Sequence, residues 1–362
     1  MLSEKYHKYN DSLKSDFLNI FDQTNHLWKD VKNKKIFLTG CTGFFGYWIL
    51  RSFIKANKDL KLNSKIFVLT RKKNIKKSNI FKLCNDKAIN FYIGDIRNFK
   101  YPKEKFDFII HGATTSALET FKKQDPLEKC SIIVDGTRHI LNFAKKCKCK
   151  KFLYLSSGAV YGYQPPNIKK ISEDSVIAPK TNNKDFDNSA LGQSKRMAEL
   201  LVTIYSQKNY FSTSIARCFS FVGPLIPLDI HYAIGNFLKN AVLKKSTYIK
   251  SDGQAVRSYM YMTDLTAWIW KILFKGKNLE IYNVGSEEEI RIKDLAKLIN
   301  KLTGNKKKIL YRKKNEKKRK NRYIPSNFKI KKELKVIQKV KLKDAILKTY
   351  KNINNNRKFY NI

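Results

Sequence analysis

Short apolar runs alternate with amphipathic stretches over the first 220 residues of this 362-residue chain. The apolar runs are rich in β-branched and aromatic residues, which favours buried β-strands. The stretches between them carry apolar residues three or four positions apart, which is typical of helices that pack one face on a core. The pattern predicts strands at 35–38, 66–70, 89–93, 108–111, 152–156 and 213–217, and helices at 47–56, 126–146 and 190–208.

This alternation predicts an α/β fold of the Rossmann type, a doubly wound parallel sheet with helices on both faces and a ligand at the carboxyl ends of its strands. Beyond residue 220 the pattern loosens, because Gly223-Pro224 and Pro227 interrupt the chain. Helices are expected there at 233–243, 265–274, 292–302 and 342–350, and strands at 258–261 and 281–284.

These patterns suggest three regions. We expect an N-terminal helical extension at 1–33, a Rossmann domain at 34–220 and a smaller α/β substrate-binding portion at 221–362. Some strands and helices of the last portion are expected to return to the Rossmann domain.

The chain is strongly basic, with 74 Lys and Arg against 30 Asp and Glu, a formal charge of +44. Such a charge attracts phosphate-bearing ligands, nucleic acid or anionic lipid surfaces. The lysines are spread along the chain, with one dense run at 306–322, and no nucleic-acid-binding motif accompanies them. We therefore interpret the charge as a compositional bias and expect no specific nucleic-acid partner.

Two further features concern the compartment. No apolar run approaches the ~18 to 20 residues of a membrane span, and the N-terminal segment is polar, so we expect no membrane insertion and a cytoplasmic protein. Six cysteines without framework spacing indicate reduced thiols. Cys147 and Cys149 form one Cys-x-Cys pair, but no second pair or histidine cluster completes a tetrahedral set, so no metal site is expected.

The most informative motif follows the first predicted strand. Gly40, Gly43 and Gly46 are spaced three apart between that strand and the first helix. Such glycines allow a tight turn, close approach of backbone to phosphate, and close packing of helix on strand. Backbone N–H groups at the helix N-terminus can then hold a pyrophosphate, so the motif predicts a dinucleotide.

Several motifs in order carry a family resemblance. The chain resembles the extended short-chain dehydrogenase/reductases, in particular the NAD-dependent epimerase/dehydratase group that acts on nucleotide sugars, over residues 34 to 350 or so. The motifs lie at 39–46, 94–96, 111–113, 156–162, 217–224 and 257–259, the last followed by Asp264.

The resemblance implies tightly bound NAD or NADP. Where an acidic residue would bind the ribose of NAD, the chain has Arg71, which suits a 2′-phosphate and slightly favours NADP; if Arg71 instead stacks on adenine, either cofactor can bind. The implied cofactor residues are Gly40, Thr42, Gly43, Phe44, Phe45, Gly46, Arg71, Asp95, Ile96, His111, Ala113 and Lys195.

In this family a tyrosine four residues before a lysine removes a hydroxyl proton as hydride leaves the same carbon. The lysine holds the ribose, and a Ser or Thr hydrogen-bonds the reacting oxygen. Lys195 and Ser157 match the lysine and the serine, but Leu191 stands at the tyrosine position. Loss of a general acid/base typically costs roughly 10²- to 10⁴-fold in rate.

Three explanations for Leu191 stay open. The chain is a non-catalytic relative that binds nucleotide and sugar; or it uses another group, with Tyr161 or Tyr163 nearest in sequence; or it is an active-site variant of an active enzyme. Tyr161 is favoured as a structural aromatic.

The resemblance also narrows the type of reaction and indicates which residues bind the substrate. Dehydratases of the family carry Asp-Glu after the active-site Thr, whereas this chain has Gly158-Ala159 after Ser157. Dehydration is therefore disfavoured. The reactions that remain are epimerisation and oxidation or reduction at a sugar carbon. Ile133 and Ser220 replace asparagines of the family. The residues expected at a nucleotide-sugar substrate are Ser157, Ser220, Asn236, Arg257 and Arg322, and the resemblance implies a homodimer through the two long helices.

Overall fold

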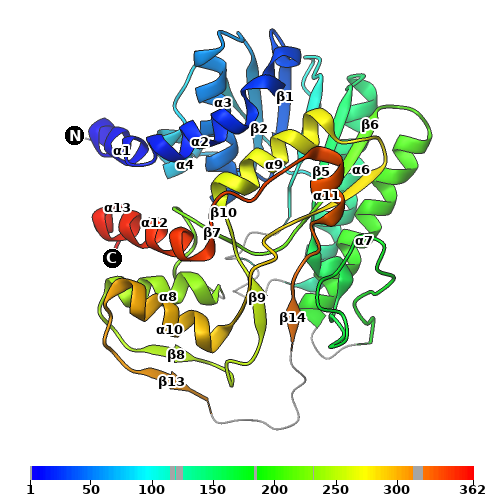
Figure 1. Ribbon diagram of the computed structural model, residues 1–362. Coiled ribbons are helices and arrows are strands. Elements are labelled where there is room, and N and C mark those ends of the chain that lie inside the picture. Colours follow the sequence, from blue (N-terminus) through cyan, green and yellow to red (C-terminus); the bar gives the residue numbers. More distant parts are fainter. Residues whose placement is uncertain (1, 115–118, 120–124, 183–185, 231, 313–320) are drawn as a thin grey trace.

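The structure is a computed structural model that describes residues 2–114, 119, 125–182, 186–230, 232–312 and 321–362. Its centre is a seven-stranded sheet in which every neighbouring pair is parallel (Figure 1). In spatial order the strands are β3 (Ile89–Ile93), β2 (Lys65–Thr70), β1 (Lys35–Thr39), β4 (Phe108–His111), β5 (Lys151–Ser157), β6 (Ser212–Cys218) and β11 (Glu280–Val284).

The strand order reverses beside β1, because the chain runs outward through β2 and β3 and then returns to β4 on the other side of β1. A crevice at the carboxyl ends of the strands opens at such a reversal, and ligands of α/β sheets bind there. The register aligns Leu38 of β1 with Val68 of β2 and Ile110 of β4. The predicted Rossmann-type sheet is thereby confirmed.

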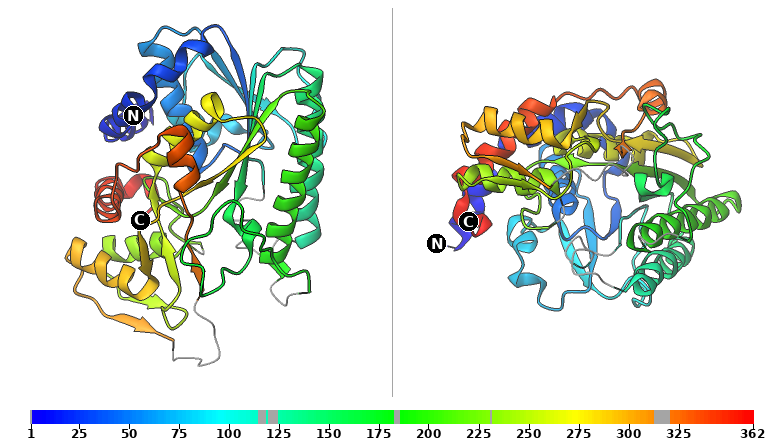
Figure 2. Two further views of the ribbon diagram at one scale, coloured as in Figure 1. Left: turned by 45° about the vertical axis from the view of Figure 1, so that its right-hand side comes forward. Right: turned by 90° about the horizontal axis from the view of Figure 1, so that it is seen from below.

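Helices cover both faces of the sheet. On one face α6 (Pro126–Lys146) and α7 (Phe186–Gln207) stand side by side (Figure 2). On the other face lie α2 (Lys14–Thr24), α3 (Phe44–Asp59) and α9 (Met262–Lys275). Because side chains alternate along a strand, Leu38 joins the core under α3 and α9, and its neighbour Phe37 joins the core under α6 and α7.

The two ends of the chain meet on one side of the molecule (Figure 1). Asp16 of α2 is buried and accepts hydrogen bonds from Tyr261 and Lys348, each at 2.6 Å. Tyr9 stacks on Phe359 with ring centres 4.2 Å apart. These contacts join α1 (Leu2–Asp11) and α2 to α12 (Leu342–Asn355) and α13 (Arg357–Tyr360), and η1 (Asn25–Val31) follows α2 and packs on α9.

The remaining elements are short and gather mostly beyond residue 220. One small sheet pairs β9 (Val256–Ser258) with β12 (Glu289–Arg291) and β14 (Arg322–Tyr323), and two others pair β7 with β10 and β8 with β13. The other elements are η2 (Ile75–Lys77), α4 (Asn79–Leu83), η3 (Gly158–Tyr161), β7 (Phe221–Val222), α8 (Ala233–Val242), β8 (Thr247–Ile249), β10 (Met260–Tyr261), α10 (Ile292–Thr303), β13 (Ile309–Tyr311) and α11 (Phe328–Leu334).

The prediction of one strand at 258–261 is wrong in detail, because β9 and β10 are separate strands with Tyr259 between them and pair with different partners. All six cysteines are free thiols. Over the described ranges, no helix has both the length and the apolar character needed to cross a bilayer.

Candidate functional site

The turn after β1 contains three glycines. A Cβ added at two of them would collide with backbone atoms, and a Cβ at the third would not. Gly40 has a φ of +73°, and a Cβ there would lie 2.2 Å from the carbonyl carbon of Gly112 on the loop after β4. A Cβ at Gly46 would lie 1.7 Å from the carbonyl oxygen of Cys41, which allows α3 to pack on the turn. A Cβ at Gly43 would meet nothing within 4 Å. The second glycine therefore faces open space.

Gly43 is also the N-cap of the 16-residue helix α3 and caps it with no side-chain hydrogen bond. The first N–H groups of a helix need an acceptor, and the helix dipole makes that acceptor preferably an anion. Nearby, after β4, the Thr114 hydroxyl is buried without a hydrogen-bond partner. An open glycine, an uncapped helix start and an unpartnered hydroxyl together fit the phosphates and ribose of a dinucleotide.

Two predicted adenosine-side residues are held by neighbours. The Arg71 guanidinium lies 2.7 Å from a carboxylate oxygen of Glu119. Asp95 accepts two hydrogen bonds of 2.9 Å from the Arg97 guanidinium, and these lower the pKa of Asp95. Ile96 is buried.

The His111 side chain lies inside the protein, at the end of β4. Its ring is fully buried and hydrogen-bonds Thr39 at 2.7 Å and Thr137 at 3.0 Å. Burial, together with the charge of Lys195, holds its pKa well below the usual value, so the ring is neutral. Its side chain therefore ties β4 to β1 and α6.

Lys195 reaches the edge of the sheet from α7. Its Nζ donates a 2.9 Å hydrogen bond to the carbonyl oxygen of Leu155 and lies 4.7 Å from the ring centre of Tyr154. The side chain is only 3% exposed. Burial lowers the pKa of Lys195 to about 8, although Cys218 and Glu199 oppose the shift.

Leu191 lies one helical turn before Lys195 on the same face of α7. It is half-buried and packs against the core under α6 and α7. At the next residue, Gly192, a Cβ would lie 2.6 Å from the carbonyl oxygen of Ala159, so α7 is pressed onto the turn η3 that follows Ser157. The structure thus brings Leu191, Lys195 and the end of β5 together.

A buried polar network lies behind this edge. Glu199 receives hydrogen bonds from Ser156 at 2.5 Å and from the Arg217 guanidinium at 2.7 Å. Arg217 also donates to the Tyr161 hydroxyl at 2.8 Å, which in turn donates to Asn283 at 2.9 Å. The network joins α7, β5, β6, η3 and β11.

Tyr161 is consequently a structural residue. It is 1% exposed, its hydroxyl is engaged on both sides, and burial raises its pKa to about 12. This arrangement gives it no freedom to exchange a proton with a ligand. Tyr163 points outward and is exposed.

A cavity of about 700 Å³ connects the glycine turn to the smaller portion of the chain. It brings together three of the predicted substrate residues, Ser220, Asn236 and Arg257. The Arg257 guanidinium donates to the carbonyl oxygens of Val256 at 2.9 Å and Asn321 at 3.1 Å, and burial lowers its pKa. Other lining residues include Phe44, Phe45, Phe219 and Tyr259.

Arg322 does not line this cavity. Its guanidinium forms an ion pair with Glu289 and a 3.3 Å hydrogen bond to the carbonyl oxygen of Lys169. These contacts join β14 to β12 and to the chain at Lys169, and the substrate contact of Arg322 stays a prediction.

The sequence reasoning missed the next residue, Tyr323, whose ring lies 4.6 Å from that of Phe219. A Cβ at Gly158, directly after Ser157, would lie 2.6 Å from the Tyr323 hydroxyl. The alternation of side chains along a strand was a signal for Tyr323. Because successive residues point to opposite sides, the residue after an outward Arg322 points inward.

Comparisons with known proteins agree with this geometry. The sequence pattern described as the NAD dependent epimerase/dehydratase family matches residues 36–285. A dTDP-D-glucose 4,6-dehydratase of Dictyostelium discoideum is 32% identical over 289 residues, which cover 75% of this chain and 62% of that protein. A trifunctional UDP-glucose 4,6-dehydratase, epimerase and reductase of Arabidopsis thaliana is 27% identical over 281 residues, which cover 75% of this chain and 40% of that protein.

Two solved structures share the fold. A UDP-glucose 4-epimerase of Thermotoga maritima with UDP-glucose has a TM-score of 0.75 and 20% identity, and the match covers 89% of this chain and 99% of that one. A UDP-glucuronic acid 4-epimerase of Bacillus cereus in complex with NAD has a TM-score of 0.73 and 23% identity, with the same coverage of 89% and 99%.

The buried ammonium of Lys195 generates a prediction about stability. Its pKa of about 8 in the folded protein lies below 10.5, the usual value for lysine, so the charged form destabilises the fold. This cost is full below pH 8 and is lost as the pH rises toward 10.5. We expect Lys195→Met to raise the free energy of unfolding at pH 7 by roughly 1–3 kcal/mol, with the gain shrinking by pH 10.

Urea unfolding of both proteins at the two pH values measures this effect. Lys297→Met, at an exposed position of α10, serves as the control and should change stability little at either pH. A stability difference for Lys195→Met that is the same at pH 7 and pH 10 would contradict the prediction.

Proposed function

The chain belongs to the NAD-dependent epimerase/dehydratase family, and we propose that it binds a nucleotide sugar and catalyses NAD(P)-linked hydride transfer at a sugar carbon. The observation that carries this proposal is the cavity of about 700 Å³, which reaches from the glycine turn to Ser220, Asn236 and Arg257. The chain spans 62% and 40% of the first two curated relatives, so their activities support only the class of reaction.

Each part of the site has a role in this proposal. The bound dinucleotide supplies hydride acceptance and return. The N-terminus of α3 binds its phosphates, Lys195 holds a ribose hydroxyl, and Ser157 hydrogen-bonds the reacting sugar oxygen. In the cavity, Arg257 pairs with the diphosphate of the substrate.

Epimerisation, or oxidation or reduction at one sugar carbon, fits these residues better than dehydration does. Water loss needs an acid and a base beside the sugar, and the two residues after Ser157 are Gly158 and Ala159. Several similar proteins are dehydratases, and this chain differs from that chemistry at these two positions.

A second candidate function is favoured by one observation. Leu191 stands one turn before Lys195, where the family places its tyrosine, and it is packed into the core. A protein with this change that kept the cavity would bind nucleotide sugar and cofactor without turnover.

The diphosphate role of Arg257 predicts a selective loss. Arg257→Met should weaken binding of UDP or dTDP by about 10- to 100-fold, because two charge-assisted hydrogen bonds are lost. Arg322→Met, on the neighbouring strand of the same sheet and paired with Glu289, should change it less than twofold. Calorimetric titration measures both. Equal effects of the two changes, or no binding to the unchanged protein, would contradict the proposed site.

We propose that the protein binds NADP in preference to NAD. Arg71 follows β2 and favours the 2′-phosphate of NADP, while Glu119 neutralises part of its charge. We expect NADP to bind about two- to fivefold more tightly than NAD, and Arg71→Ala to abolish that difference. Lys65→Ala, at the opposite end of β2, should leave the ratio unchanged. Fluorescence titration with both dinucleotides measures it, and a preference for NAD in the unchanged protein would refute the proposal.

We also propose that the second copy of this chain in a homodimer packs on α6 and α7. Met197, Leu200 and Ile204 lie on one face of α7 and are exposed, and Leu127 at the start of α6 is 78% exposed. Burying such large apolar side chains against the same surface of a second copy gives an isologous interface.

Leu200→Asp should convert the dimer to a monomer, since two symmetry-related carboxylates would be buried without partners. Ile337→Asp, at another exposed apolar position, should leave the dimer intact. Sedimentation equilibrium at micromolar concentration distinguishes the two masses of about 42 and 84 kDa. A monomeric unchanged protein would rule out this interface.

A further inference from the structure

A phenol lies beside the active serine although Leu191 has replaced the expected tyrosine. The hydroxyl of Tyr323 is 2.6 Å from the position that a Cβ at Gly158 would take, and its ring carbon Cζ is 2.8 Å from it. Any side chain larger than glycine at 158 would displace this phenol. The Ser157 side chain is near enough to lower the pKa of Tyr323 through hydrogen bonding. The two hydroxyl groups therefore share one side of the β5 terminus.

Tyr323 lies directly behind two residues that line the substrate cavity. The register of the small sheet pairs Tyr323 of β14 with Arg257 of β9. The Arg257 guanidinium lies 5.9 Å from the Tyr323 ring centre, and the ring of Phe219 lies 4.6 Å from it. Arg257 and Phe219 both line the cavity. A sugar attached to a diphosphate at Arg257 would consequently lie within reach of this phenol.

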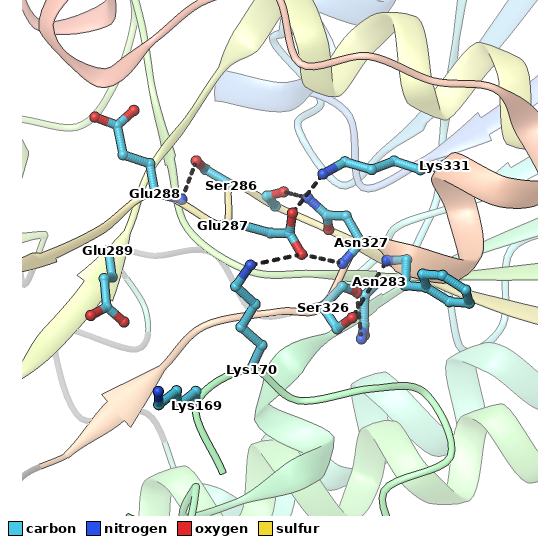
Figure 3. Close-up of polar contacts among 12 residues, drawn as sticks. Lys169, Lys170, Asn283, Ser286, Glu287, Glu288, Glu289, Ser326, Asn327 and Lys331 are labelled. Atoms are coloured by element: carbon cyan, nitrogen blue, oxygen red, sulfur yellow. Dashed lines mark hydrogen bonds and ion pairs between the residues drawn. The ribbon is translucent and has the colours of Figure 1, made fainter.

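An acidic segment after β11, residues 286–289, holds β14 and the chain after it in place (Figure 3). Glu289 pairs with Arg322, directly before Tyr323. Glu287 accepts a 3.0 Å hydrogen bond from the backbone of Asn327 and pairs with Lys331 and Lys170 (Figure 3). The backbone on both sides of Tyr323 is thereby fixed, which is what a proton-transfer group requires.

The ionisation of Tyr323 agrees with a role as an acid. Burial raises its pKa, while the hydrogen bond with Ser157 and the charge of Arg257 oppose the shift. The phenol is therefore protonated at neutral pH and has a proton to donate. Tyr161, by contrast, is committed to Arg217 and Asn283.

We propose that Tyr323 replaces the missing tyrosine of the family and exchanges a proton with the sugar oxygen bound by Ser157. This role rests on the proposed function. In the direction of reduction, the O–H bond of Tyr323 breaks and a new O–H bond forms on the sugar carbonyl oxygen. The carbonyl carbon gains hydride from the reduced nicotinamide dinucleotide, which is oxidised. In the reverse direction the sugar hydroxyl returns its proton to the Tyr323 oxygen.

The variant Tyr323→Phe tests this role because it keeps the ring and its contact with Phe219 and removes only the hydroxyl. Turnover of a nucleotide sugar should fall by about 10²- to 10⁴-fold. Affinity for the nucleotide sugar, measured by calorimetry without turnover, should fall by about three- to tenfold through one lost hydrogen bond. Affinity for the nucleoside diphosphate alone should change less than twofold. Tyr311→Phe, at an exposed tyrosine of β13, is the matched control.

A panel of UDP- and dTDP-sugars and the change Leu191→Tyr separate failure of this role from failure of the proposed function. Full turnover by Tyr323→Phe, or unchanged sugar affinity, overturns the role of Tyr323 and leaves the function standing. Turnover only after Leu191→Tyr is introduced shows a binding protein with a disabled site, and overturns the role as well. Recovery of turnover when Leu191→Tyr is added to Tyr323→Phe supports it, because either phenol then serves the same oxygen.

Discussion

The buried ion pair between Glu199 and Arg217 is the constraint on which the site depends. Both side chains are less than a tenth exposed, and their hydrogen bonds reach Ser156 and Tyr161. Removing one partner of such a pair typically costs about 3–5 kcal/mol, because the other charge stays buried and unpaired. Since Glu199 lies one turn after Lys195 on α7, the same pair that joins α7 to β6 also fixes the position of Lys195 relative to Ser157.

Acidic residues are scarce in this chain, 30 against 74 basic ones, and several of them hold segments that are distant in sequence. Asp16 joins the N-terminal helix α2 to Tyr261 and to Lys348 near the C-terminus. Glu289 pairs with Arg322 of β14. Glu287 accepts a hydrogen bond from the backbone of Asn327, farther along the chain (Figure 3). Most surface lysines can have no acidic partner in such a chain, so long-range electrostatic attraction of phosphate ligands adds to the local contacts at Arg257 and α3.

Local patterns predicted the main sheet and its long helices, because a buried parallel strand reads as an apolar run and an amphipathic helix repeats every 3.6 residues. The two- and three-residue strands around β9 are too short for a periodic pattern, so their pairing could not be foreseen, although a motif had marked Arg257. His111 and Arg322 were noticed because they lie in or beside motifs. The contacts of His111 with Thr39 and of Arg322 with Glu289 join segments that are distant in sequence, so the motifs could not show them.

The burial of Lys195 helps to decide whether this site still binds a ligand or is only the vestige of an active site. Its nearest carboxylate, Glu199, is already paired with Arg217, so the ammonium has the Leu155 carbonyl and the Tyr154 ring as neighbours but no dedicated counter-ion. A buried ammonium in this position destabilises the folded state, and the surrounding core would accept an apolar side chain of similar length. The fold gains nothing from this charge, which supports the proposal that Lys195 donates a hydrogen bond to a ligand at the edge of the sheet. Leu191 removes a proton carrier from that edge, but it leaves intact the lysine, the serine and the cavity that would hold such a ligand.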